Sequence, residues 1–256
     1  MSQKVPKHID ELDSMKRYPK ELFFRGNLDL LDRFKISIVG TRRPSSYTRS
    51  ITLELSSKLS RAGVCIVSGA AMGVDAIAHS GASSSNTIAV LGNGLDIRYP
   101  ATNRTLLESI EQDGLLLSPF EDGFRATNWS FVVRNEIVVA LSDLLIVTQA
   151  DLGSGSLRSV EYALKMQKKI FVIPHRLHES RGTNDLLAQA KANLILDVDQ
   201  FVETYAQTSR CIDDPFLQFC LNSPTYEEAV RVYPQEVFSY ELDGKIEVVA
   251  GRIRVC

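Results

Sequence analysis

The residues of this sequence best suited to bind a ligand are two neighbouring arginines that follow a glycine at the end of a short apolar run, ISIVGTRRP. A glycine directly after a buried strand is typical of the phosphate-binding turns of doubly wound α/β folds. The second and third glycines of the dinucleotide fingerprint GxGxxG are missing here, and the two arginines stand in this part of the turn. Guanidinium groups bind phosphate oxygens in two-pronged fashion, so this turn is a candidate anion site. Its residues are Gly40, Thr41, Arg42 and Arg43.

A second glycine-bearing segment, SGAAMGVDAIAH, follows the apolar run at 64–67. Ser68 can donate a hydrogen bond to a phosphate, and Gly69 allows a bulky ligand to approach the backbone. For Asp75 and His79 in the same segment we favour structural roles. An acidic residue in the first turn of a helix complements the helix dipole, which explains Asp75.

Two later segments also combine residue types that suit a nucleic acid. In NWSFVVRNEIVVALSD, Phe131 and Arg134 could stack a base and hold a phosphate, although packing in the core explains them equally well. We interpret Trp129 as a core anchor. Farther along, the loop GSGS offers backbone N–H groups and the hydroxyls of Ser154 and Ser156 to an anion.

Charge and missing motifs narrow the function. The net charge is −2, so any anion site must be local, and residues 35–61 hold six bases against one acid. His175 and His178 lack an obvious third metal ligand, and neither a GxSxG elbow nor a GK[ST] phosphate loop occurs. We therefore predict no metal, no cofactor and no catalytic residue. Scattered cysteines, a polar N-terminus and no apolar stretch of membrane-spanning length predict a cytoplasmic protein that does not enter the membrane.

Apolar runs of strand length alternate with amphipathic segments of helix length, and the runs are rich in Val, Ile and Leu without alternation. This pattern predicts a Rossmann-like, doubly wound and mostly parallel sheet covered by helices, with all the loops above at one edge. The predicted strands are 36–39, 64–67, 87–91, 115–117, 144–147, 170–173 and 193–196. The predicted helices are 48–62, 74–81, 103–112, 129–141, 156–168 and 184–190.

The two ends of the chain do not show this alternation of strands and helices. We predict an N-terminal extension at 1–34 with one short strand, a core domain at 35–206 and a polar linker at 207–213. A small C-terminal domain at 214–256 follows, with three helices and a hairpin in a winged-helix-like pattern. The predicted helices are 216–221, 225–230 and 235–242, and the predicted hairpin strands are 245–249 and 252–255.

Six segments, in this order, closely resemble the DNA-processing protein A family (DprA, also called Smf): IVGTRRP, IVSGAAMGVDAIAH, RYPATN, FVVRNEIVVALSD, SGSL and GTNDLL. The resemblance covers most of the chain, from about residue 19 to the end. It implies a Rossmann-like core that binds and protects single-stranded DNA without known catalysis. It also implies loading of the RecA recombinase during natural transformation, and a homodimer.

Carried over by position, the resemblance makes Arg42 a main phosphate contact, supported by Arg43, Thr41 and Gly40. Ser68 and Gly69 would line the same pocket. The FxxRN motif would contact bases and backbone through Phe131, Arg134 and Asn135. Asn128 is assigned to the same DNA-binding groove. A basic residue is common at this position in the family.

The sequence departs from the family at two positions and in its C-terminal charge. Glu136 stands where the family usually has an arginine, and Asn128 also removes a positive charge. Both changes predict weaker and less salt-dependent DNA binding. From 212 to 256 we count eight acids and four bases, a net charge of −4. Because duplex binding needs phosphate neutralisation, we expect the C-terminal domain to contact protein, or the core domain, more than DNA.

Two other functions stay open. A related class of Rossmann-like enzymes cleaves nucleotides at the N-glycosidic bond, and GSGSLRSVE is similar to their catalytic loop with Glu161 near the acidic position. However, the double glycine of that loop is lost, and no second carboxylate pairs with Glu161. The other alternative is a nucleotide sensor without turnover.

Overall fold

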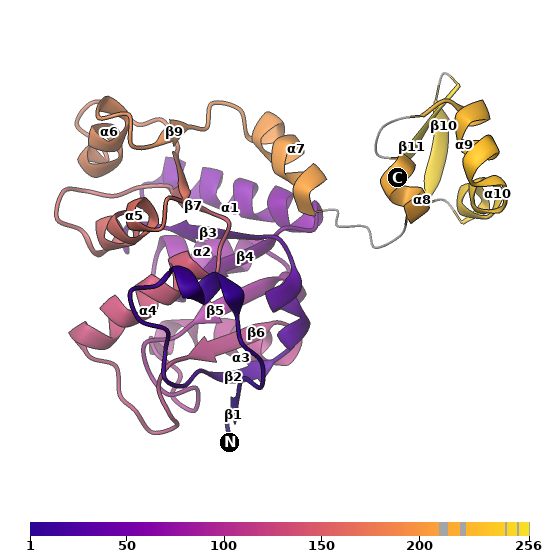
Figure 1. Ribbon diagram of the computed structural model, residues 1–256. Coiled ribbons are helices and arrows are strands. Elements are labelled where there is room, and N and C mark those ends of the chain that lie inside the picture. Colours follow the sequence, from indigo (N-terminus) through magenta and orange to yellow (C-terminus); the bar gives the residue numbers. More distant parts are fainter. Residues whose placement is uncertain (210–214, 221–223, 244, 250, 256) are drawn as a thin grey trace. The chain divides into compact units, whose positions relative to one another are not determined.

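The computed structural model describes residues 1–209, 215–220, 224–243, 245–249 and 251–255. The chain divides into two compact units, 1–209 and 210–256 (Figure 1). Among the described residues, no helix is both long enough and apolar enough to cross a lipid bilayer.

The first unit is built on one sheet, whose described strands follow the order β1-β2-β6-β5-β4-β3-β7-β8-β9. The strands from β6 to β9 in this order are parallel, whereas β2 runs antiparallel to β6 and β1 antiparallel to β2. The chain moves outward from β3 in one direction and returns to its other side through β7. The strands are β1 Gln3–Lys4, β2 Phe23–Gly26, β3 Lys35–Val39, β4 Cys65–Ser68, β5 Thr87–Val90, β6 Leu115–Ser118, β7 Leu144–Val147, β8 Lys169–Val172 and β9 Asn193–Leu194.

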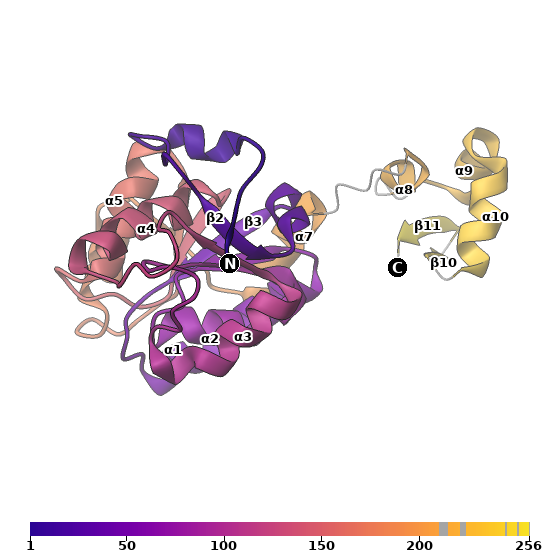
Figure 2. The same ribbon diagram turned by 90° about the horizontal axis from the view of Figure 1, so that it is seen from below.

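Helices cover both faces of this sheet (Figures 1 and 2). One apolar cluster packs α1, α2 and α7 against one face, and another packs α4 and α5 against the opposite face. The α-helices are α1 Ser46–Arg61, α2 Val74–Gly81, α3 Arg104–Asp113, α4 Asn128–Ala140, α5 Gly155–Lys165, α6 Arg181–Ala188 and α7 Val198–Ser209. Short 3₁₀ helices are η1 Asp10–Ser14, η2 Leu28–Asp32, η3 Ser84–Asn86 and η4 Ala101–Asn103.

The predicted fold class is confirmed, and every predicted strand and helix of the core is present, most of them with ends shifted by a few residues. The segment 1–34 differs from the predicted extension. Its strand β2 pairs along β6, and Leu12, Leu30 and Leu31 are buried in the core. An antiparallel edge strand is not part of the alternation of strands and helices that the sequence shows from residue 35 onward. The segment therefore belongs to the first unit although its sequence pattern differs from that of the rest of the unit.

Helix α7 was not predicted. Its side chains Val198, Phe201, Val202 and Tyr205 pack in the cluster that joins α1 to the sheet. Their spacing of three and four residues is that of an amphipathic helix. The helix continues through Ser209, into the segment predicted as linker, and residues 210–214 lie outside the described residues.

In the second unit, three helices precede a two-stranded hairpin, as the winged-helix-like pattern indicated. Its core contains Phe216, Ala229, Val237, Ile246 and Ile253. The predicted division into domains at 1–34, 35–206, 207–213 and 214–256 stays a prediction. The elements are α8 Pro215–Cys220, α9 Tyr226–Val232, α10 Pro234–Leu242, β10 Ile246–Val249 and β11 Arg252–Val255.

Candidate nucleic-acid interface

A cavity of about 420 Å³ opens at the carboxyl edge of the sheet, beside β3. The connections leave β3 in one direction and β7 in the other, and such a reversal of strand order forms a crevice in open α/β sheets. The walls are the β3–α1 turn, the β4–α2 loop, one face of α4 and the start of α5. Ten predicted site residues line it together: Gly40, Thr41, Arg42, Gly69, Asn128, Phe131, Arg134, Asn135, Ser154 and Ser156.

Two predicted site residues do not line the cavity. Ser68 is fully buried, and its hydroxyl donates to the carbonyl of Ile38 at 2.7 Å, so it ties β4 to β3. The prediction that the Ser68 hydroxyl donates a hydrogen bond to a phosphate is therefore wrong. Arg43 is exposed outside the lining, with its backbone N–H bonded to the Thr41 hydroxyl at 3.2 Å.

Helix α4 presents one face to the cavity. A capping box starts it, in which the Thr127 hydroxyl accepts from the backbone N–H of Ser130 and the Ser130 hydroxyl accepts from that of Thr127. Positions 128, 131, 134, 135 and 138 then lie on one helical face and line the cavity.

Glu136 does not belong to this face. Its carboxylate accepts a hydrogen bond at 3.2 Å from the backbone N–H of Lys16, in the N-terminal segment. Glu136 is not among the lining residues, and its effect on DNA binding stays a prediction. Asn128 does line the cavity, so that departure from the family pattern lies at the groove.

Arg134 lines the cavity but is largely buried, with 5 % of its side chain exposed. Its Nη1 lies 3.7 Å from Asp75 Oδ2 and donates to the Val90 carbonyl at 3.4 Å. Among the described residues, its Nε has no hydrogen-bond partner. A Cβ atom at Gly69 would lie 1.1 Å from Nη1, so this glycine provides the space for the guanidinium group.

Asp75 is buried beside Arg134, in the cavity wall, and its role is more than capping a helix dipole. Burial raises the pKa of its carboxyl group, and the Arg134 guanidinium opposes this shift. A buried ion pair of this kind holds both groups in a fixed geometry at a desolvation cost. Arg134 therefore reaches the cavity as a positioned cation with one unsatisfied donor.

Phe131 lies close to two arginines of the cavity, Arg42 and Arg134. Its ring centroid is 5.9 Å from the Cζ of Arg42 and 5.7 Å from the Cζ of Arg134, within the range of cation–π attraction. Gly92 leaves room for the ring, because a Cβ atom there would lie 2.8 Å from it. Trp129, which we predicted as a core anchor, is 62 % exposed, because it lies off the inward face of α4. Its ring makes an edge contact with Phe120 instead.

Two features bring further positive potential to the cavity. Ser154 precedes α5 without capping it, and its buried hydroxyl has no hydrogen-bond partner in the part of the chain described. The free N–H groups of that helix start attract anions. Arg158, one turn into α5, also lines the cavity and was not singled out from the sequence. Its position one helical turn after the predicted anion loop was the available signal.

The electrostatic balance of the lining favours an anion. Arg42 is exposed and, among the described residues, forms no ion pair with a carboxylate. Asp75 is the only acidic residue of the lining in the described structure, and Arg134 already pairs with it. Arg158 has Glu161 as an ion-pair partner at 3.5 Å. Arg42 and the start of α5 are therefore left to bind phosphate oxygens, next to the Phe131 ring.

The enzyme alternative finds little support in this geometry. Glu161, its candidate acid, does not line the cavity, and its carboxylate lies 3.5 Å from Arg158 on the exposed side of α5. Buried His79 bonds the Thr87 hydroxyl at 2.8 Å, and burial lowers its pKa to about 3. Neither residue is arranged as an acid or base that faces a ligand in the cavity.

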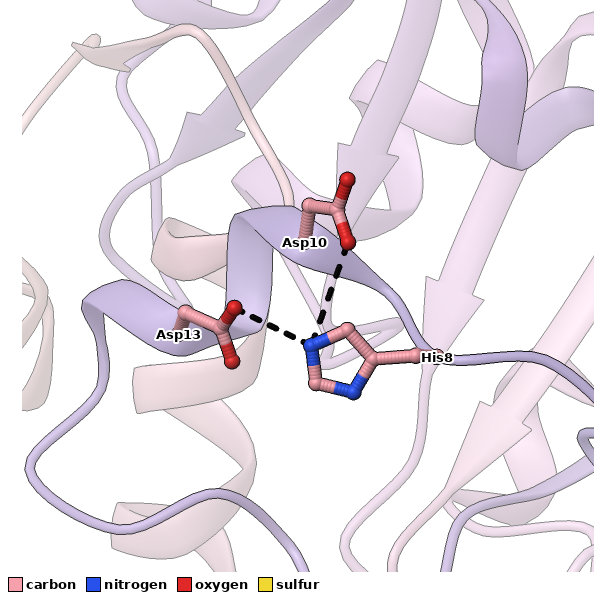
Figure 3. A group of neighbouring side chains, drawn as sticks. All are labelled: His8, Asp10 and Asp13. Carbon is pink, nitrogen blue, oxygen red and sulfur yellow. Dashed lines mark hydrogen bonds and ion pairs between the residues drawn. The ribbon is translucent and has the colours of Figure 1, made fainter.

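A cluster of possible metal ligands lies at the surface near η1 (Figure 3). His8 Nε2 is 3.0 Å from Asp13 Oδ2 and 3.9 Å from Asp10 Oδ1. The hydrogen bond to Asp13 raises the pKa of His8, which favours the protonated imidazolium over the neutral ring that a metal requires. We interpret this exposed cluster as an ion pair that fixes η1.

Sequence comparison identifies relatives of the whole first unit. The sequence model of the family described as DNA recombination-mediator protein A matches residues 2–206. The protein Smf of Synechocystis sp. is 36 % identical over 72 % of this chain and 48 % of its own length. The DNA processing protein DprA of Bacillus subtilis is 31 % identical over 80 % of this chain and 70 % of its own length. The chain thus spans about half the length of the Synechocystis protein.

Two solved structures are also similar. The DNA processing protein A of Helicobacter pylori, studied for its unique single-stranded DNA binding mode, is 40 % identical with a TM-score of 0.80, over 82 % of this chain and 97 % of that one. The DprA structure of Streptococcus pneumoniae is 33 % identical with a TM-score of 0.71, over 78 % of this chain and 72 % of that one. With its doubly wound sheet and the match over residues 2–206, the chain belongs to the DNA recombination-mediator protein A family.

Proposed function

We propose that this protein binds and protects single-stranded DNA through the cavity at the carboxyl edge of its sheet. The observation that carries the proposal is exposed Arg42 at the cavity, 5.9 Å from the centroid of the Phe131 ring, with buried Arg134 5.7 Å from the same centroid. A guanidinium group binds a phosphate of a strand, and an aromatic ring beside it offers a stacking surface for a base. The solved relative from Helicobacter pylori, which is described as binding single-stranded DNA, supports this function.

The binding has little sequence preference. The lining contains guanidinium groups, helix N–H groups and hydroxyls, which bind a backbone that every sequence shares, besides the amides of Asn128 and Asn135. Stacking on an aromatic ring tolerates any base, because every base has a π-face.

The further role is that of a mediator, which loads the RecA recombinase on the bound strand during natural transformation and acts as a homodimer. Family membership supports recombination mediation, and the RecA partner and the dimer are expectations from the resemblance. The negative charge of the C-terminal unit favours protein contacts there over duplex DNA.

A gel-shift series with homopolymer oligonucleotides at two salt concentrations tests the function. We expect similar affinities for different homopolymers, and affinities that fall with salt because phosphate contacts release counterions. Binding of mononucleotides without oligonucleotides would instead favour a nucleotide sensor. Release of a base from nucleoside monophosphates, abolished by Glu161→Gln, would replace the proposal with the glycosidase alternative.

A further inference from the structure

Three arginines along α1 and before β3 lack acidic partners. Arg49 Nε donates to the Pro44 carbonyl at 3.3 Å, and Arg61 Nη2 donates to the Ser57 hydroxyl at 3.0 Å. Arg33 Nη1 donates to Asn86 Oδ1 at 2.8 Å. Within the described residues none of these arginines forms an ion pair with a carboxylate, so their charge is available to a ligand.

The neighbouring Lys58 is different. Its ammonium group pairs with Glu54 at 2.8 Å and with Asp199 of α7 at 2.6 Å. The basic excess predicted for residues 35–61 therefore divides into two lysines with acidic partners, since Lys35 also pairs with Glu11 at 2.6 Å, and arginines without such partners. Of those arginines, Arg49 lies in the first turn of α1 and Arg61 is its last residue.

Two open grooves lie beside these arginines. One, of about 400 Å³, lies between α1 and α2 and includes Arg49, Leu53 and Ser80. The other, of about 460 Å³, includes Arg33, Ser57, Arg61 and Gly81. Leu53 and Ser57 are one turn apart on α1, and Ser80 precedes Gly81 on α2, so the two grooves are neighbours.

The grooves begin near the cavity and lead away from it. Helix α1 starts at Ser46, directly after the turn that carries Arg42, and α1 and α2 lie side by side (Figures 1 and 2). The sixteen residues of α1 span about 24 Å, so Arg61 lies at the opposite edge of the sheet from Arg42. A Cβ atom at Gly81 would lie 1.9 Å from the Ser56 hydroxyl oxygen, so the floor between the helices is closely packed.

We propose that the α1–α2 grooves form a track that carries a single DNA strand from the cavity to the opposite edge of the sheet. The proposal rests on the proposed function, because it concerns the part of the strand that the cavity does not hold. Arg49, Arg61 and Arg33 bind its phosphates, and serine hydroxyls add donors. Leu53, which is 47 % exposed, gives the strand an apolar contact.

The test is a length series of oligothymidylates, measured by fluorescence anisotropy with the full chain. The variant Arg49→Gln with Arg61→Gln removes two charges from exposed positions of α1. We expect it to bind the shortest oligonucleotides as the unmodified protein does, and to lose the affinity gained with length. The salt slope for long oligonucleotides should fall by about 1.4, about 0.7 for each phosphate contact.

The matched control is Arg17→Gln with Lys165→Gln. It also removes two exposed charges, from the side of the sheet covered by α4 and α5. The control should keep the full dependence on length. Ser80→Glu, which adds a negative charge inside the track, should reproduce the loss even if the arginine variant is unstable.

The outcomes separate the track from the cavity. An unchanged length dependence in the folded arginine variant and in Ser80→Glu would overturn the track, while binding of short oligonucleotides would still support the proposed function. If no oligonucleotide binds the unmodified protein, the proposed function itself fails and the track fails with it.

Discussion

The β3–α1 turn and helix α4 both bring an arginine to the same cavity, but in opposite states. Arg42 of the turn is exposed and has no acidic partner among the described residues, whereas Arg134 of the helix is buried beside Asp75. A free surface cation costs little to keep and is available for binding, whereas a buried one is costly unless its partner remains. One wall thus provides affinity and the other provides a fixed geometry. This division makes different predictions for stability and for binding.

The largest expected effect is on stability, from Arg134→Ala. The substitution leaves the Asp75 carboxylate buried without its partner, so we expect a loss of about 3–5 kcal/mol in the free energy of unfolding. Urea denaturation followed by circular dichroism measures it. The variant Asp75→Asn with Arg134→Met removes both charges and should recover much of this loss, while DNA binding stays impaired. A loss below about 1 kcal/mol in Arg134→Ala would contradict the buried role.

Arg42→Ala should do the reverse. We expect single-stranded DNA binding to weaken by about 1–3 kcal/mol, the range of charge-assisted hydrogen bonds, with stability within about 0.5 kcal/mol of the unmodified protein. Filter binding at fixed salt provides the measurement. Arg43→Ala is the matched control, because that neighbouring arginine lies outside the cavity lining and should lose less. Equal losses from both substitutions would mean that the turn acts only as a diffuse positive charge.

His79 is another buried ionisable group, and the charge of Arg134 acts on it. Burial is the main cause that lowers its pKa from 6.5 to about 3, and Arg134 lowers it further. Between these two values the unfolded chain binds the proton, so stability falls as the pH falls below 6.5. From about pH 7 to about pH 5.5 this residue should cost about 1 kcal/mol of stability. In His79→Gln that part of the acid sensitivity should be missing, whatever the absolute stability, and an unchanged pH profile would argue against a neutral buried histidine.

The smallest expected effect distinguishes Glu136 from Asn128, two positions of α4 at which the sequence predicted the same loss of positive charge. Glu136→Arg should change DNA affinity by less than about 0.5 kcal/mol, because Glu136 bonds the N-terminal segment and not the cavity. Asn128→Lys, on the cavity face, should add about 0.7 to the salt slope. Salt titrations of both variants provide the test, and a steeper slope in Glu136→Arg would show that charge acts across the whole helix.

The sequence was sufficient for the sheet, because long apolar runs without alternation are typical of strands buried on both faces. It was also sufficient for the position of the cavity, because loops at the carboxyl ends of parallel strands share one edge. Ten candidate residues lie together for that reason.

Side-chain partners could not be predicted from residue types. Ser68 stands at a strand end where a phosphate donor is plausible, yet a carbonyl of the next strand takes its hydroxyl. Trp129 has the size of a core residue, but its neighbour in the structure is a loop ring at the surface. The Asp75–Arg134 pair joins helices that are distant in sequence, and no local pattern links its two members.

The contact between Gly69 and Arg134 has a consequence for how this sequence can change over time. Any side chain at position 69 would occupy the space of the guanidinium group, so it displaces Arg134 from Asp75. A substitution of Gly69 is therefore tolerated only if Arg134 has first been replaced by a smaller residue. The same substitution is damaging while Arg134 is still present. The two positions should behave as an epistatic pair in a mutational library, in which the fitness of one allele depends on the other.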